Sequence, residues 1–425
     1  MTQPINGIMK SRQRHIMRPF LASLLILSPF TPAAACLWDY DTLQAERAAF
    51  PGALELIVGK FLRHSDAFYE WRIEDRSAKI AAAQAGEISL SEKELAAAYD
   101  DWAVALDKLG RHDEAIEVIN QKAERLPDVG EYKTHANRGT FLIHGGRLEE
   151  GLVELKKALE INPEAHFGRE EYQVLLVEYV LEKRDGAEKV SLPLDDSGRN
   201  SLYQHGPFAK WLLEQQGLGE SQDKAAIAAE IERAAKGVMG MMRFGNFQSP
   251  ILLEALGDLL AGRRGDVQGQ RLAARAYLRA AMEVDDDAAR DAYREMAQEI
   301  LRMQVSETTT GRLLHEAMTL KELEDHLARE TKEANLWFES IVNDEKLWVQ
   351  YPNAKLNPDE RFWQKYGEQV IELGYARLPP RHFLEAGLPW QIQVTMAAIA
   401  VLTVALVVGL LLWRKKRPTG YDKFP

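Results

Sequence analysis

Residues that could carry out chemistry are scattered along this chain and form no catalytic set. Met239, Met241 and Met242 could bind Cu(I) through their thioethers, but methionines at such spacing are typical of packing positions. His64 and His205 stand in polar contexts that favour structural roles. The sequence also lacks CxxC, CxxCH, HExxH, GxSxG and P-loop motifs. We therefore predict no catalytic residue, no cofactor and no metal site.

The elements that would position any functional side chain are helices, because helical periodicity extends over most of the chain and alternating strand patterns are absent. Two segments in particular repeat one another. Gly110 returns as Gly146 and Pro127 returns as Pro163, which gives a period of 36 residues. A period of this size indicates a stacked array, in which each unit buries its apolar face against the next.

The repeated segments, within residues 91–165, resemble two units of the tetratricopeptide repeat (TPR), a helix-turn-helix motif of about 34 residues. The resemblance rests on small residues where the two helices of a unit must pack closely, followed by a turn glycine and a closing proline. The small residues are Ala103 and Ala115 in the first unit, and Gly139 and Gly151 in the second. Three residues depart from the family pattern: Lys122, His135 and Arg138.

In the TPR family, first helices line a concave groove that binds an extended peptide or a partner's helix. Carried over to this sequence, the resemblance implies a candidate partner groove, with Asp100 and Asp101 outside the core. Some members of the family clamp a terminal carboxylate, but Asp100 at a clamp position argues against that specificity here. The candidate groove residues are Asp100, Asp101, Asp107, Lys133, Asn137 and Thr140.

The rest of the chain up to residue 377 is also predicted to be helical. We expect an N-terminal helical region over 36–90, with one helical pattern at 54–83, and a helical region with a loop over 166–248. Residues 249–285 resemble a degenerate third TPR-like hairpin, and 286–377 form a helical membrane-proximal region. Within it, a helix starting at Asn357-Pro358 is expected to continue past Ile371.

The two ends predict export and anchoring. Residues 1–35 have a basic stretch, a short apolar run and small residues before Cys36, as in a cleaved signal peptide. A lipoprotein signal with Cys36 lipidated is the alternative. Residues 390–413 contain a charge-free span long enough for a transmembrane helix, between a linker at 378–389 and a basic cytoplasmic tail at 414–425. A cell-wall sorting signal is the alternative for this end.

The net charge of the chain argues against one class of partner. The chain carries −11, and the two basic ends contribute +4 each, so the exported part carries −19. Such a surface repels phosphate backbones, which argues against nucleic acid.

The sequence therefore predicts an all-α protein, a helix-turn-helix array with additional helices and one C-terminal transmembrane helix. Its body would face the periplasmic side and act as a scaffold or assembly factor for a basic or neutral protein or peptide partner. An envelope enzyme with an active site outside the repeats is the alternative.

Overall fold

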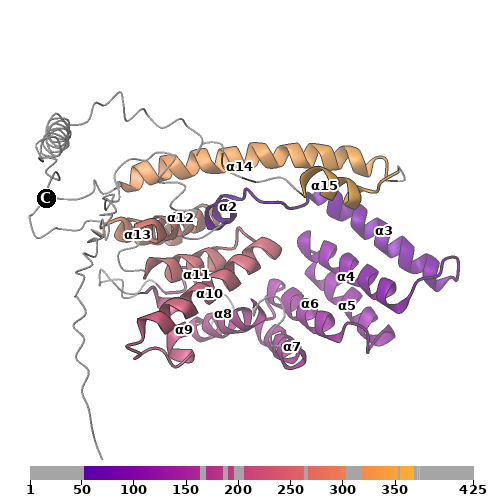
Figure 1. Ribbon diagram of the computed structural model, residues 1–425, viewed down its shortest axis with the longest axis horizontal. Helices are drawn as coiled ribbons and strands as arrows, with labels where there is room; N and C mark the ends of the chain where they lie inside the picture. The colour runs from indigo at the N-terminus through magenta and orange to yellow at the C-terminus, as the bar shows by residue number, and fades with distance from the viewer. Residues whose placement is uncertain are drawn as a thin grey trace, which may run out of the picture. The chain divides into compact units, whose positions relative to one another are not determined.

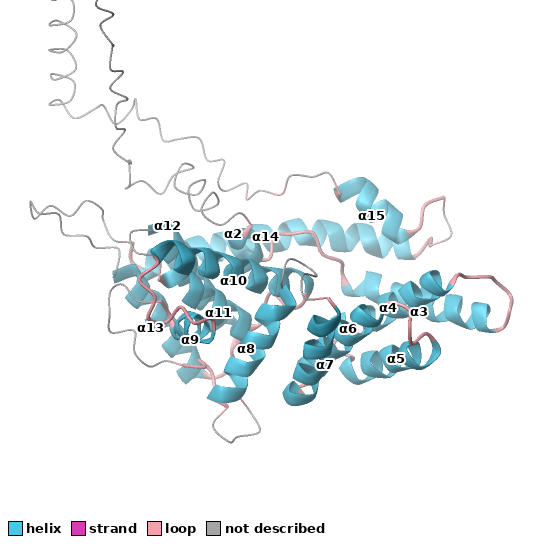
Figure 2. Ribbon diagram, turned by 60° about the horizontal axis from the view of Figure 1, so that its bottom comes forward, coloured by secondary structure: helices cyan, strands magenta, loops and turns pink. Residues whose placement is uncertain are grey.

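A computed structural model of the chain describes residues 52–162, 169–184, 190–195, 205–262, 267–302, 318–352 and 355–367, together with Ile371 and Leu373. All of them lie within one compact unit, Cys36–Pro425. These residues form fourteen helices and no strand, which confirms the predicted all-α class (Figure 1, Figure 2). No helix in these ranges is both long and apolar enough to cross a bilayer. The predicted signal peptide, linker, membrane span and tail lie outside the described residues.

The repeated segments form two consecutive helical hairpins. Unit 1 consists of α4 (Glu92–Lys108) and α5 (His112–Arg125), and unit 2 consists of α6 (Glu131–His144) and α7 (Leu148–Ile161). Each of these helices packs against the next along the chain. Gly110 and Gly146 turn the chain within the hairpins at φ 74° and 80°. Glycine enters this left-handed region without the Cβ clash that other residues meet, so the predicted turn glycines are confirmed.

Small residues allow the two helices of each unit to approach closely. A Cβ on Gly139 would lie 2.9 Å from Leu155 Cγ and 3.0 Å from the carbonyl oxygen of Gly151. A Cβ on Gly151 would lie 2.7 Å from the Gly139 carbonyl oxygen. In unit 1 the crossing residues Ala103 and Ala115 are fully buried. Both hairpins therefore depend on backbone contact that larger side chains would prevent.

The two unusual residues of unit 2 form a polar crossing between α6 and α7. His135 and Arg138 stand where unit 1 has Tyr99 and Trp102, and both contact Glu154, which stands where α5 has Val118. The His135 Nδ1–Glu154 Oε2 distance is 2.7 Å, and Lys157 Nζ lies 2.8 Å from Glu154 Oε1. Hydrogen bonds and charge thus replace aromatic packing at this position.

Beyond unit 2 the chain continues as a further set of packed helices. They are α8 (Arg169–Lys183), α9 (Pro207–Gln215), α10 (Lys224–Phe244), α11 (Pro250–Ala261), α12 (Val267–Glu283) and α13 (Asp287–Arg302). Close packing of α11 on α12 agrees with the expected hairpin at 249–285. Gly257 permits it, because a Cβ there would lie 2.4 Å from the ring of Tyr277.

Two expected helices have different bounds. Residues 54–83 form two helices, α2 (Ala53–Val58) and α3 (Asp66–Gln84), because Gly59 takes a left-handed φ of 83° and Ser65 starts a new helix as its N-cap. The helix after Asn357 is α15 (Pro358–Tyr366), which has the expected capping box but ends before Gly367. Ile371 is therefore not part of it.

The longest helix, α14 (Leu320–Val349), contributes buried residues to two of the three hydrophobic cores of the described residues. The largest core is shared by α2 and α8 to α14, a small one lies between α14 and α15, and the third lies among α3 to α6. Figure 1 shows α14 extending along α12 and α13 toward α3 and α15, and it contacts all four helices as well as α2. A capping box of Thr319 and Glu322 starts this helix.

Three glutamates of α14 hold the N-terminal segment and α12 in place. Glu330 receives two hydrogen bonds of 3.0 Å from the guanidinium of Arg275 on α12, and neither side chain is exposed. Glu333 binds Lys60 at 2.5 Å. Glu345 accepts a hydrogen bond of 2.7 Å from the backbone N–H of Ser65, the N-cap of α3. The position of α3, and of α4 packed on it, therefore depends on α14.

The close crossing of α6 and α7 generates a stability prediction. Gly139→Ala should lower the free energy of unfolding by about 1–3 kcal/mol, because the added methyl meets backbone as well as Leu155. Glu149→Ala on α7, whose side chain is exposed, should change it by less than about 0.5 kcal/mol. Urea denaturation followed by circular dichroism measures both. Equal losses for the two variants would contradict the observed crossing.

The polar crossing generates a prediction on pH. Burial favours the neutral form of Glu154, but hydrogen bonds from Lys157, His135 and Arg138 outweigh it and lower the pKa of Glu154 to about 2. A carboxylate with a lowered pKa stabilises the fold above its unfolded pKa of about 4.5, and this contribution is lost as the pH falls toward 2. Wild type should therefore lose more stability than Glu154→Gln between pH 5 and 2 in urea titrations. Parallel losses would show that Glu154 is not coupled to its partners.

Candidate functional site

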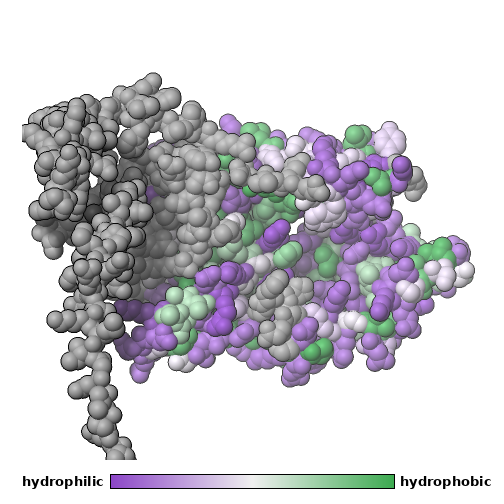
Figure 3. Space-filling model, in the orientation of Figure 1, coloured by the Kyte–Doolittle hydropathy of each residue, from purple (hydrophilic) through white to green (hydrophobic). Residues whose placement is uncertain are grey.

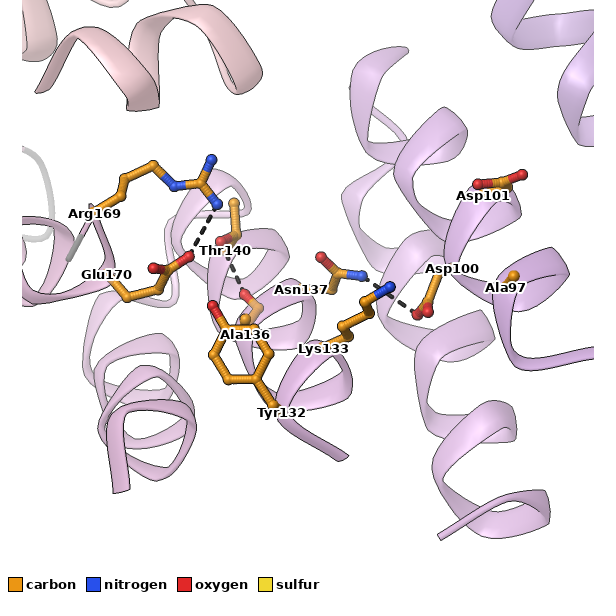
Figure 4. A pocket seen from close by; sticks show the side chains of 10 residues that line it. All are labelled: Ala97, Asp100, Asp101, Tyr132, Lys133, Ala136, Asn137, Thr140, Arg169 and Glu170. Carbon is orange, nitrogen blue, oxygen red and sulfur yellow. Dashed lines mark hydrogen bonds and ion pairs between the residues drawn. The ribbon is translucent and has the colours of Figure 1, made fainter. Parts of the chain in front are cut away.

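A pocket of about 270 Å³ opens beside the first helices of both units and continues to α8. Five of the six candidate groove residues line it, and Figure 4 shows their side chains around the same space. The structure thus brings together residues that the TPR resemblance placed on one surface. The lining residues are Ala97, Asp100, Asp101, Tyr132, Lys133, Ala136, Asn137, Thr140, Arg169 and Glu170.

Asp100 is tied to a buried lysine of its own unit. Lys122 Nζ lies 2.7 Å from Asp100 Oδ1, and the side chain of Lys122 is completely buried while that of Asp100 is 16% exposed. Burial raises the pKa of Asp100, although Lys122 acts in the opposite direction. A buried ammonium needs such a partner, so Lys122 and Asp100 compensate one another. Asp100 therefore belongs in part to the core, contrary to the expectation from the sequence.

Asp101 connects the pocket to α3 and α15. Arg76 of α3 donates from Nε to Asp101 Oδ2 at 2.9 Å and from Nη2 to Asp359 Oδ2 of α15 at 2.9 Å. The side chain of Asp101 is 42% exposed, whereas that of Arg76 is only 16% exposed. Asp101 thus presents its carboxylate to solvent at the rim of the pocket, and Arg76 partly balances its charge.

The side chains that α6 contributes to the pocket are mostly polar, and two of them already form hydrogen bonds inside the protein. Asn137 donates to Asp100 Oδ1 at 3.4 Å, and the hydroxyl of Thr140 donates to the backbone carbonyl of Ala136 at 2.9 Å. Lys133 lies near enough to Asp100 for its charge to lower the pKa of that carboxyl, but no hydrogen bond or ion pair joins it to a residue that the structure describes. Its ammonium is therefore the lining cation that is most available to a ligand.

Sequence reasoning missed three lining residues at the α8 end, Tyr132, Arg169 and Glu170. Glu170 is 2% exposed and receives a hydrogen bond of 2.9 Å from Arg169 Nη2. Burial, followed by the nearby charge of Glu170, raises the pKa of Tyr132. No repeat landmark marks 166–248, so only the packing of α8 after α7 reveals Arg169 and Glu170, whereas Tyr132 lies within unit 2, on α6. They make the pocket mixed in charge rather than simply acidic.

Asp107, the sixth candidate, does not reach the pocket. Its carboxylate lies on the other side of α4. There Nδ1 of His112 is 2.8 Å from Asp107 Oδ1, and Nδ1 of His144 is 2.9 Å from Asp107 Oδ2. Burial alone would raise its pKa, but the two histidines outweigh burial, and the pKa of Asp107 is lowered. Asp107 is therefore not among the residues that line this pocket, because its carboxylate lies at the junction of α4, α5 and α6.

The Asp100–Lys122 pair generates a prediction that separates core from surface. Asp100→Asn should cost about 3–5 kcal/mol of unfolding free energy, because it leaves the Lys122 ammonium buried without its carboxylate. Asp101→Asn should cost less than about 1 kcal/mol, since that carboxylate is exposed. Urea denaturation of both variants and of Asp100→Ala/Lys122→Met measures the effect. The double variant should recover most of the loss, and failure to recover it would show that the pair does not act as a unit.

The chain matches no protein-family model, no curated protein and no solved structure. What the structure establishes is an all-α chain in which helical hairpins follow one another and present a pocket on their first helices.

Proposed function

We propose that this protein is an exported TPR-type scaffold or assembly factor, tethered by a transmembrane helix at 390–413, whose pocket binds an extended segment of a partner protein. The observation that carries the proposal is the convergence of Asp100, Asp101, Lys133, Asn137 and Thr140 on one open pocket. Two hairpins in the same register, with small residues at both crossings, support the TPR part of the proposal.

The chemistry of the pocket favours a polar peptide over an apolar or strongly acidic ligand. Its lining offers the exposed carboxylate of Asp101 and the ammonium of Lys133, so both donors and acceptors of a peptide backbone find counterparts. Hydrophilic residues also predominate on the described face in Figure 3. The net charge of −19 on the exported part favours a basic or neutral partner. Compensation of Asp100 by Lys122 makes that preference weaker than the count of aspartates suggests.

Filling the pocket tests the proposal without changing its charge. Ala97 is exposed at the pocket wall, and Ala97→Trp should occupy the space while leaving the core of α4 intact. Ala228→Trp, at an exposed position of α10 outside the pocket, is the matched control. The full-length chain is crosslinked in its native membranes, and the captured proteins are identified by mass spectrometry.

We expect Ala97→Trp to reduce capture of at least one basic or neutral protein about tenfold or more relative to Ala228→Trp, as loss of an interface hot spot would. Added salt should reduce the capture of a basic partner by wild type as well. An identical set of captured proteins for wild type and both variants would remove the pocket from the function of this chain.

A further inference from the structure

Three side chains with metal-binding donors meet at the junction of units 1 and 2, away from the pocket. Asp107 lies in the last turn of α4, His112 is the first residue of α5 and His144 is the last residue of α6. The Nδ1 atom of His112 is 2.8 Å from Asp107 Oδ1, and that of His144 is 3.0 Å from the same oxygen. The two rings stand 5.7 Å apart between centroids, at an interplanar angle of 62°.

We propose that Asp107, His112 and His144 form a binding site for a divalent transition metal ion, with Zn²⁺ as the best fit. Two imidazoles and one carboxylate are a set that binds zinc and other first-row metals. Zinc lies about 2.0–2.2 Å from such donors, which places neighbouring donor atoms of a tetrahedral site roughly 3.4 Å apart. The observed separations of 2.8 to 3.0 Å therefore need only small side-chain movements to accept an ion.

Metal binding by the two neutral histidines needs no further group on the protein to accept a proton. In the hydrogen-bonded state each neutral ring carries its proton on Nδ1 and donates it to the carboxylate. On binding, the Nδ1 lone pair coordinates the ion, and the proton moves through water to Nε2 of the same ring, so no proton is lost overall. A ring that is already protonated releases one proton to solvent instead.

The exposure of the three groups leaves room for further ligands. The side chains of His112 and His144 are 28% and 27% exposed, whereas that of Asp107 is 7% exposed. The carboxylate thus forms the inner wall, and water can complete the coordination from the open side. The neighbouring cation, Lys108, directs its ammonium at the carbonyl oxygens of Phe244 and Gly245, at 2.6 and 2.7 Å.

The same chain provides a contrasting histidine–carboxylate contact. His135 binds Glu154 at 2.7 Å, but Arg138 and Lys157 bind that carboxylate as well. Arg138 and Lys157 already occupy the space around the Glu154 carboxylate, so His135 and Glu154 should not bind a metal ion. Among the described residues, Asp107, His112 and His144 are the group whose donor geometry is suited to a metal ion.

An ion in this site would link three helices that belong to both units. It would hold the end of α4, the start of α5 and the end of α6 together, and α4 and α6 are also the helices that line the pocket. Zinc would therefore stabilise the junction on which the spacing of the two units depends. Search by sequence motif missed the site because its ligands are separated by four and by thirty-one residues, from 107 to 112 and from 112 to 144.

The test measures metal binding by the full chain, purified without a polyhistidine tag and stripped with a chelator. Isothermal titration with Zn²⁺ should show about one ion bound per chain, and Co²⁺ should give the visible absorption of a site with nitrogen and oxygen ligands. His112→Gln and His144→Gln keep an N–H that can donate to Asp107 but lose a good ligand. Each should weaken Zn²⁺ binding about tenfold or more, and bound Zn²⁺ should raise the melting temperature of wild type more than theirs.

His135→Gln is the matched control and should bind Zn²⁺ as wild type does. Circular dichroism establishes that each variant is folded before titration. The proposal is overturned if wild type binds no Zn²⁺ or Co²⁺, or if His112→Gln, His144→Gln and His135→Gln all bind as wild type does. Equal weakening by His135→Gln would also overturn it, since that result would place the ion elsewhere on the chain.

Discussion

The candidate site depends on one constraint: a charge that is removed from water inside a helical unit must meet an opposite charge there. Lys122 occupies a position where the repeat pattern expects a small apolar residue, and it is completely buried. Asp100 of the facing helix, α4, forms an ion pair with it, and this pair fixes the position of the Asp100 carboxylate in the pocket wall. Loss of either member would leave the other charge uncompensated beside the pocket, so the stability of unit 1 and the properties of the site are coupled.

Unit 2 meets the same constraint with other residues. Where unit 1 packs Tyr99 and Trp102, unit 2 has His135 and Arg138, and Glu154 from the opposite helix satisfies both. A change on one helix is thus matched by a change on its partner. The backbone crossing at Gly139 and Gly151 stays closely packed in either case. The two hairpins therefore share one backbone geometry, although unit 1 packs aromatic side chains at this position and unit 2 has charged ones.

Much of the fold follows from local signals in the sequence. Turn glycines at 110 and 146, capping residues before α11 and α15, and small residues at 103 and 139 predicted where helices turn, start and cross. Five groove residues were also predictable, because repeat register fixes which face of a first helix a residue occupies. Asp107 was not, since His112 and His144 reach it from other helices. Nor were Arg169 and Glu170, whose place follows from long-range packing of α8.

The contacts of α14 have a consequence for the order in which the chain can fold. Lys60 meets Glu333 across 273 residues of sequence, and His64 meets Glu345 across 281. At synthesis rates of about 5–20 residues per second, the N-terminal helices wait some tens of seconds before their partner exists. During that interval the apolar face of α2 is uncovered, while α3 and the hairpins of units 1 and 2 can already pack on one another through local contacts. Of the described helices, α2 is the first to be synthesised and among the last to be buried, so its apolar surface is exposed to aggregation for longest.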